Sequence, residues 1–156
     1  MNGYKKSPEL IFVDMDNTIA ENKTCKSIEF YEGMYAEKRS IRIVIDAILN
    51  TYPASRIYIL SKTQGGERGR IEKREWLERH CPDMTLNRPR FIEPNQSKCT
   101  VICALAASRG IKSRECLIID DNKSVLQECD KAGIQTLYPQ QVICEYESRK
   151  IENKTC

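Results

Sequence analysis

The fold of this chain is set by one short stretch, Leu10-Ile11-Phe12-Val13-Asp14-Met15-Asp16-Asn17-Thr18. Four apolar residues in a row predict a strand that is buried on both faces, as in a parallel sheet. The strand delivers two carboxylates, Asp14 and Asp16, into the turn that follows it. Open α/β sheets bind their ligands at the carboxyl ends of the strands. Two acids at such a position are costly to bury unless a ligand uses them.

A second apolar run, Cys-Leu-Ile-Ile at 116–119, ends in Asp120 and Asp121. If the two strands are neighbours, as many as four carboxylates meet at one edge of the sheet. Such a cluster of oxygen ligands predicts a site for a hard cation such as Mg²⁺, and with it phosphoryl transfer. The alternative is that Asp120 and Asp121 only cap the next helix, because an acidic side chain suits a helix N-terminus.

The rest of the chain alternates between strand-like and helix-like patterns. Apolar runs predict further strands at 57–60, 90–92 and 134–138. Helical spacing of apolar residues predicts helices at 40–50, 67–80, 97–109 and 122–132. Ser40 is the expected N-cap of the first helix. This alternation predicts an α/β protein with a three-layer, Rossmann-like fold, in which helices cover both faces of a mainly parallel five-stranded sheet.

Composition narrows the class of protein. The 156 residues are enough for one domain with a hydrophobic core, expected over 1–144 and followed by a tail, 145–156. No apolar run approaches the roughly 20 residues that span a membrane, and the N-terminus lacks the apolar segment of a secretion signal. We therefore expect a cytoplasmic protein, as a monomer or homodimer. A net charge of +3 does not favour nucleic acid as the partner.

Eight cysteines are scattered along the chain, and none belongs to a CxxC pair. This spacing argues against a zinc site or a disulfide framework. Cys99 and Cys103 are one turn apart on one expected helix, while Cys116 and Cys129 occupy expected core positions. We therefore predict reduced thiols that pack as small apolar groups.

The order of these motifs resembles the haloacid dehalogenase (HAD) superfamily of phosphotransferases, over about residues 9–140. The first motif of that family, an apolar strand followed by Asp-x-Asp-x-Thr, is present at 14–18, and the fourth is the acidic pair at 120–121. The second motif, a Ser or Thr that ends the next strand, is met by Ser61. The third, a Lys at a helix start, is met by Lys98. The first and fourth motifs are specific, whereas the second and third are weak when taken alone.

The resemblance implies a strand order of 5-4-1-2-3 and a Mg²⁺ cofactor. Asp14 would be the nucleophile that forms a phospho-aspartate, and Asp16 the general acid and base. The metal ligands would be Asp14, the backbone carbonyl of Asp16 and Asp121, with Asp120 behind it, although the two members of the pair could exchange roles. The phosphate of the substrate would be bound by Asn17, Ser61, Lys62 and Lys98. Lys112 is a weaker alternative to Lys98.

We expect a small phosphate ester as the substrate. The helical sequence Glu-Lys-Arg-Glu-Trp-Leu at 72–77 is similar to the 5′(3′)-deoxyribonucleotidase branch of the family, which favours a nucleotide. The segment 19–39 is long enough for a flap or minimal cap but too short for a large cap domain. Its aromatic residues Phe30, Tyr31 and Tyr35 either stack on a base or pack the flap onto the core.

Two other functions stay open. A reduced cap leaves the site accessible, which would suit a phosphatase that acts on the 3′ ends of nucleic acids. A weakly active phosphate-binding or regulatory module would keep the same fold. A receiver domain of the two-component type is disfavoured, because a receiver phosphorylates an Asp at the end of its third strand, whereas Asp14 and Asp16 follow the first strand here.

Overall fold

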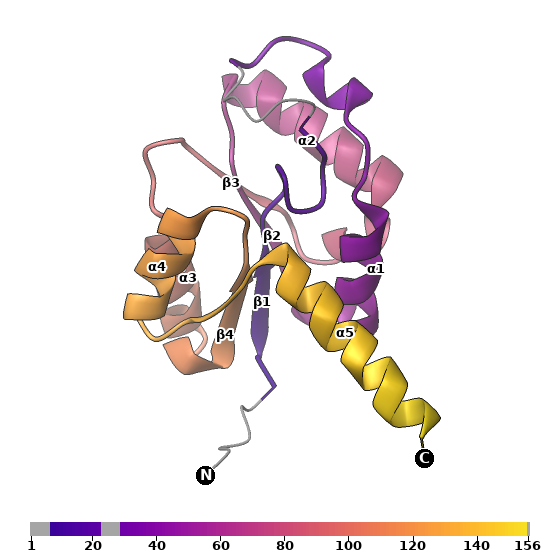
Figure 1. Cartoon of the computed structure of the whole chain (residues 1–156). Coiled ribbons are helices and arrows are strands. Elements are labelled where there is room, and N and C mark those ends of the chain that lie inside the picture. The colour runs from indigo at the N-terminus through magenta and orange to yellow at the C-terminus, as the bar shows by residue number, and fades with distance from the viewer. Residues whose placement is uncertain (1–6, 23–28, 156) are drawn as a thin grey trace.

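A computed structural model describes residues 7–22 and 29–155 of the chain (Figure 1). In this part, one sheet contains β1 (Leu10–Val13), β2 (Ile57–Lys62), β3 (Arg90–Ile92), β4 (Cys116–Ile119) and β5 (Gln135–Leu137). All four pairings are parallel, and the strand order is β3-β2-β1-β4-β5. This is the predicted order read from the opposite edge, so the predicted fold class is confirmed.

Helices cover both faces of the sheet. The α-helices are α1 (Arg42–Thr51), α2 (Gly66–His80), α3 (Lys98–Ser108), α4 (Lys123–Lys131) and α5 (Pro139–Lys154). Short 3₁₀ turns are η1 (Met34–Glu37), η2 (Ala54–Arg56), η3 (Pro82–Thr85) and η4 (Ser113–Glu115). In Figure 1, α1, α2 and α5 lie on one face and α3 and α4 on the other.

Alternate residues of the strands serve two separate hydrophobic clusters. In β1, Ile11 and Val13 pack with residues of α1, α2 and α5, whereas Leu10 and Phe12 pack with residues of α3 and α4. Successive side chains of a strand point to opposite faces, so a strand that is covered on both faces is apolar at every position. This explains the unbroken apolar run that opens the chain.

Helix starts were the less predictable part of the fold. The prediction of Ser40 as N-cap is wrong: α1 begins at Arg42, its N-cap is Ile41, and Ser40 instead forms an antiparallel bridge with Ala20. At the other end, α5 begins at Pro139, a residue suited to a first helical turn, and runs without a break through residue 144.

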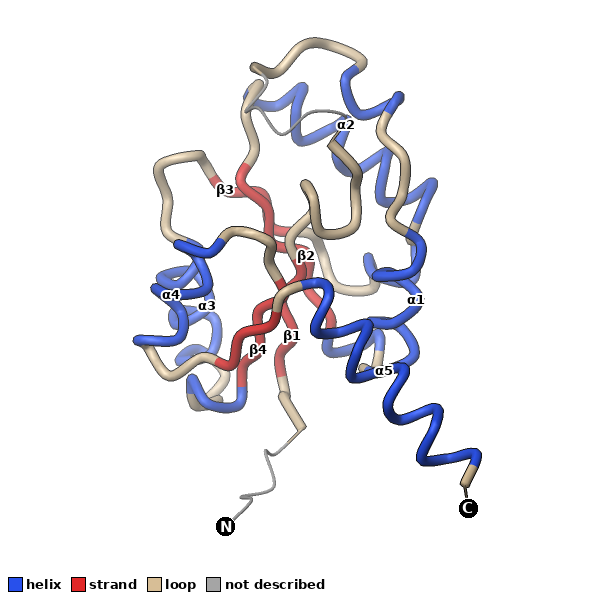
Figure 2. The backbone as a smooth tube through the Cα atoms, in the orientation of Figure 1, coloured by secondary structure: helices blue, strands red, loops and turns tan. Residues whose placement is uncertain are grey.

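The loops that follow β1, β2 and β3 gather at the end of the sheet opposite the N-terminus, as Figure 2 shows. The carboxyl ends of all parallel strands point this way, so the predicted site residues share one region. Cys116 and Cys129 are buried and free, as expected, while Cys25 and Cys156 lie outside the described residues. Within 7–22 and 29–155, no helix combines the length and the apolar character that a membrane crossing requires.

Candidate active site

Three of the four predicted carboxylates meet where β1 and β4 end. The register pairs Val13 with Ile119, so the residues that follow them, Asp14 and Asp120, leave the sheet side by side. One carboxylate oxygen each from Asp14, Asp120 and Asp121 lies within 4.8 Å of the others. Asp14 and Asp120 are buried, whereas Asp121 is exposed. The parallel pairing of two sequence-distant strands therefore builds the acidic cluster.

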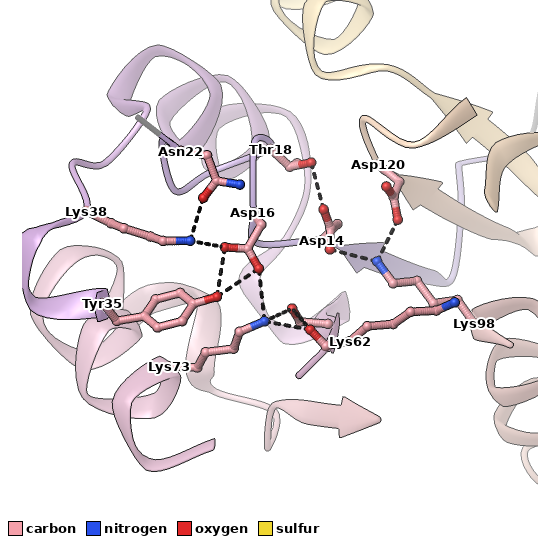
Figure 3. Close-up of polar contacts among 11 residues, drawn as sticks. Asp14, Asp16, Thr18, Asn22, Tyr35, Lys38, Lys62, Lys73, Lys98 and Asp120 are labelled. Atoms are coloured by element: carbon pink, nitrogen blue, oxygen red, sulfur yellow. Dashed lines mark hydrogen bonds and ion pairs between the residues drawn. The ribbon is translucent and has the colours of Figure 1, made fainter. Parts of the chain in front are cut away.

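Lys98 lies between two of these acids. Its Nζ is 2.7 Å from Asp14 Oδ1 and 2.6 Å from Asp120 Oδ2 (Figure 3). Burial by itself lowers the pKa of this ammonium, but the two carboxylates outweigh burial and raise it to about 12. A lysine in the first turn of α3 opposes the helix dipole, and these anions explain its place there. The weaker alternative, Lys112, precedes β4 at the other end of the sheet.

The acidic cluster holds more negative charge than Lys98 neutralises. Burial, followed by the charge of Asp14, raises the pKa of Asp120 to about 6. Burial and the charges of Asp14 and Asp120 raise the pKa of Asp121 to about 7. Carboxylate oxygens are the ligands that hard divalent cations prefer. The donor set therefore fits Mg²⁺, whose charge would relieve this repulsion. Asp120 also accepts a hydrogen bond from the Asn122 amide, and Asn122, not the acidic pair, provides the N-cap of α4.

Asp16 turns away from this cluster toward the flap and α2. Its carboxylate accepts hydrogen bonds from Lys38 Nζ at 2.5 Å, Tyr35 Oη at 2.8 Å and Lys73 Nζ at 3.0 Å (Figure 3). Burial alone would raise the pKa of Asp16, but the charges of Lys73 and Lys38 outweigh it and hold the pKa at about 2. The predicted general acid and base is therefore a carboxylate between two ammonium groups.

Lys73 connects Asp16 to the second predicted motif. Its Nζ also donates to Ser61 Oγ and to the Lys62 carbonyl, both at 2.7 Å, and only 2% of the residue is exposed. Burial, partly offset by Asp16, lowers the pKa of Lys73. Ser61 is thereby brought beside Asp16, while Lys62 directs its side chain to solvent.

The first turn after β1 positions two more residues of the first motif. Asn17 adopts a left-handed backbone, with φ at 61°, and is exposed. Asn tolerates this conformation better than most residues, so a turn role accounts for it. Thr18 is buried and donates to Asp14 Oδ2 at 3.2 Å. Together with Lys98, it fixes the orientation of the Asp14 carboxylate.

Three residues in contact with Asp16 were not predicted: Tyr35, Lys38 and Lys73. The sequence did hold a signal for Lys73, because it lies three and four positions before Trp76 and Leu77, on the buried face of α2. A lysine on an apolar helix face indicates a buried anion. Lys38 follows no periodic pattern. Its place is set by the flap, where Trp76 Nε1 donates to the Lys38 carbonyl at 2.9 Å.

Solved structures of other proteins share the fold of this chain. No family profile and no curated protein sequence matches the chain. A candidate HAD-like phosphatase from Mesorhizobium loti superposes with a TM-score of 0.56 at 15% identity, covering 94% of this chain and 88% of that one. D,D-heptose 1,7-bisphosphate phosphatase from Burkholderia thailandensis gives a TM-score of 0.51 at 15% identity, with 81% and 74% covered.

A third solved structure is the N-terminal part of the protein BF1531 from Bacteroides fragilis, which contains a phosphatase domain and was crystallised with Mg. Its TM-score is 0.52 at 18% identity, and the match covers 85% of this chain and 36% of that one. At these identities the comparisons show that this chain shares the fold of these proteins. The activities of those proteins do not follow for this chain from such a similarity.

Proposed function

We propose that this chain is a Mg²⁺-dependent phosphomonoesterase of the HAD superfamily that reacts through a phospho-aspartate on Asp14. The observation that carries this proposal is the arrangement around Asp14. This carboxylate lies at the carboxyl end of the central strand, is held by Lys98 and Thr18, and faces Asp120 and Asp121. The shared fold and the Mg-containing phosphatase domain among the structural neighbours support it.

In the proposed reaction, an oxygen of Asp14 attacks phosphorus as the bond from phosphorus to the leaving oxygen breaks. Water then attacks the phospho-aspartate and releases phosphate, which regenerates Asp14. Asp14, the carbonyl of Asp16, Asp121 and Asp120 would hold Mg²⁺, which when bound neutralises charge on the phosphoryl group. Lys98 balances part of the same charge and orients Asp14.

Asp16 would act on the leaving oxygen and on the attacking water. Its ion pairs with Lys38 and Lys73 favour the carboxylate form, which can accept the proton of the water. To protonate the leaving oxygen, Asp16 would first have to bind a proton from solvent, which these ion pairs oppose; the proton that it later takes from the attacking water would restore that protonated form. Ser61, beside Lys73, would donate its hydroxyl to the phosphoryl group, with Lys62 and Asn17 at the open side.

The proposed substrate is a small phosphate ester, with a nucleotide as one candidate. The sequence 72–77 that favours the nucleotidase branch includes two residues of the site: Lys73 contacts Asp16, and Trp76 anchors the flap at Lys38. We further propose a cytoplasmic monomer or homodimer with a single catalytic domain, in which 19–39 forms the flap and the whole of α5 belongs to the domain. Nucleic acid ends remain a less favoured substrate.

The test is Mg²⁺-dependent phosphate release from a panel of sugar phosphates, nucleotides and 3′-phosphorylated oligonucleotides. We expect Asp14→Asn to lower kcat/KM by about 10³ or more, because the nucleophile is lost. Asp130→Asn, an exposed acid on α4, is the matched control and should retain wild-type activity. If the wild-type protein releases no more phosphate than Asp14→Asn on any substrate, the proposed function is wrong and a binding module becomes the better explanation.

A further inference from the structure

A cavity of about 250 Å³ adjoins Asp16 on the side away from the acidic cluster. Its walls include Asp16, Lys38, Lys62 and Lys73, but none of Asp14, Asp120, Asp121 and Lys98. We propose that this cavity receives the leaving part of the substrate and selects phosphate monoesters whose leaving part carries a second anionic group, either a phosphate or a carboxylate. This inference rests on the proposed function, because it takes Asp14 as the point of attack.

The position of Asp16 places the leaving part in the cavity. A residue that acts on the leaving oxygen must lie within hydrogen-bond reach of it. The phosphoryl group would lie over Asp14, so the bond that breaks points from Asp14 toward Asp16. Asp16 itself forms part of the cavity wall. Whatever is attached to the leaving oxygen therefore continues into this cavity.

The charge of the wall indicates an anion. Lys38 and Lys73 are 7% and 2% exposed, and both form their ion pair with the same acid, Asp16. One carboxylate neutralises only one of these two buried ammonium groups. A buried charge is costly unless it is paired, so the remaining positive charge favours an anionic ligand. Lys62 also lines the cavity, but its side chain is exposed, so the surplus charge is that of the two buried lysines.

The phosphate that is transferred does not account for the positive charge that Asp16 leaves unneutralised on Lys38 and Lys73. It would lie at Asp14, where Lys98 and a bound cation supply positive charge of their own. The surplus lies on the other side of Asp16, on residues that line the cavity. A second anion on the same substrate molecule, separated from the first by the leaving oxygen and a short carbon chain or ring, would occupy that place.

Apolar and aromatic side chains of the flap also line the cavity, namely Phe30, Met34 and Tyr35. The Tyr35 ring lies next to the lysines, 4.3 Å from Lys38 Nζ. The Phe30 ring packs directly on Gly65, where an added Cβ would lie 2.2 Å from the ring, so the flap and the glycine-rich loop meet at this aromatic contact. A carbon skeleton can lie against these side chains while its acidic group faces the lysines. The cavity thus offers both charged and apolar side chains to one ligand.

The test compares substrate pairs that differ in the second anion. The pairs are glycerol 3-phosphate with 3-phosphoglycerate, fructose 6-phosphate with fructose 1,6-bisphosphate, and thymidine 3′-phosphate with a 3′-phosphorylated thymidine dinucleotide. We expect kcat/KM to be about tenfold higher for the doubly anionic member of at least one pair. The pair that shows the preference identifies carboxylate, phosphate or phosphodiester as the second anion.

Variants assign this preference to the cavity. Lys62→Met and Lys38→Met remove one charge each from the wall and should reduce the ratio of kcat/KM within the preferred pair. Lys154→Met, an exposed lysine at the end of α5, is the matched control and should keep the ratio. Because the ratio compares two substrates of the same variant, it is insensitive to a general loss of activity. Equal kcat/KM values within every pair, or a preference that persists in both cavity variants, would overturn the inference.

Binding separates this inference from the proposed function. Calorimetric titration of Asp14→Asn with both members of each pair measures affinity without turnover. If wild-type protein has no phosphatase activity but Asp14→Asn binds the doubly anionic member more tightly, the cavity is an anion site and the proposed function fails. If wild-type protein is active and neither kcat/KM nor affinity depends on the second anion, the proposed function stands and this inference fails.

Discussion

The two carboxylates of the first motif, Asp14 and Asp16, are two positions apart in sequence and lie in opposite electrostatic surroundings. In the acid half of the site, formed by Asp14, Asp120, Asp121 and Lys98, three carboxylates face one ammonium group. In the lysine half, formed by Asp16, Lys38 and Lys73, two ammonium groups face one carboxylate. We propose that the first half binds a cation and the second an anion. A substrate phosphate bound together with Mg²⁺, and extended by a second anionic group, would satisfy both.

Removing one buried lysine from each half should give the largest difference between them. Lys98→Met should lower the free energy of unfolding by about 3 kcal/mol, because it leaves the buried Asp14 and Asp120 without their ion-pair partner. Lys73→Met should cost less, because Asp16 keeps its ion pair with Lys38. Mg²⁺ should restore part of the loss in Lys98→Met, since a cation can replace that charge in the acid half. Mg²⁺ should not restore the free energy of unfolding that Lys73→Met loses. Urea unfolding with and without Mg²⁺ measures both effects, and equal responses to Mg²⁺ would contradict the division into two halves.

Metal binding to the acid half should stabilise the wild-type protein. At a Mg²⁺ concentration one hundred times its Kd, the expected gain in the free energy of unfolding is about 2.7 kcal/mol. Asp121→Asn removes a carboxylate of the cluster and should lose most of this gain, whereas Asp130→Asn should keep it. Thermal unfolding over a Mg²⁺ titration provides the measurement. An undiminished gain in Asp121→Asn would exclude Asp121 as a ligand.

The lysine half should make the protein sensitive to acid. The pKa of Asp16 is held at about 2, below its ordinary 3.8, so the folded state keeps this group ionised where the unfolded state binds a proton. The stabilisation, about 2 kcal/mol, is fully present above pH 3.8 and is lost as the pH falls through about 2. The Asp16→Asn variant has no carboxylate at this position, so it has no such stabilisation to lose at low pH. The difference in unfolding free energy between wild type and Asp16→Asn should therefore shrink across this pH window; a constant difference would show that the ion pairs contribute nothing.

The smallest effect concerns the contact between flap and loop. Gly65 and Gly66 both have positive φ, 78° and 56°, so alanine at either should cost about 1 kcal/mol from the backbone alone. An alanine Cβ at Gly65 would also collide with Phe30, whereas at Gly66 nothing lies within 4 Å. Gly65→Ala should therefore be the more destabilising, and the excess should disappear in a Phe30→Ala background. If the two alanine variants cost the same, Phe30 does not hold the loop.

Much of the fold followed from local patterns. The apolar runs located all five strands within a few residues, because a strand covered on both faces must be apolar along its length. The predicted positions of the helix starts were less accurate. Ser40 is a favourable N-cap by residue type, but its backbone takes part in a bridge with Ala20, a pairing that depends on distant residues. The sequence does not mark α5 as one helix from Pro139, because its charged second half has few apolar residues to continue a helical period.

The sequence alone predicted that Asp14 and Asp120 each follow an apolar strand, and parallel strands carry such residues to the same edge of the sheet. That these two strands are neighbours was implied by the family resemblance, and the observed strand order confirms it. Only the tertiary structure decided the lysine half. Lys38 and Lys73 reach Asp16 from 22 and 57 positions further along the chain. Their meeting depends on how the flap packs against α2, and packing between elements leaves no period in the sequence from which it could be predicted.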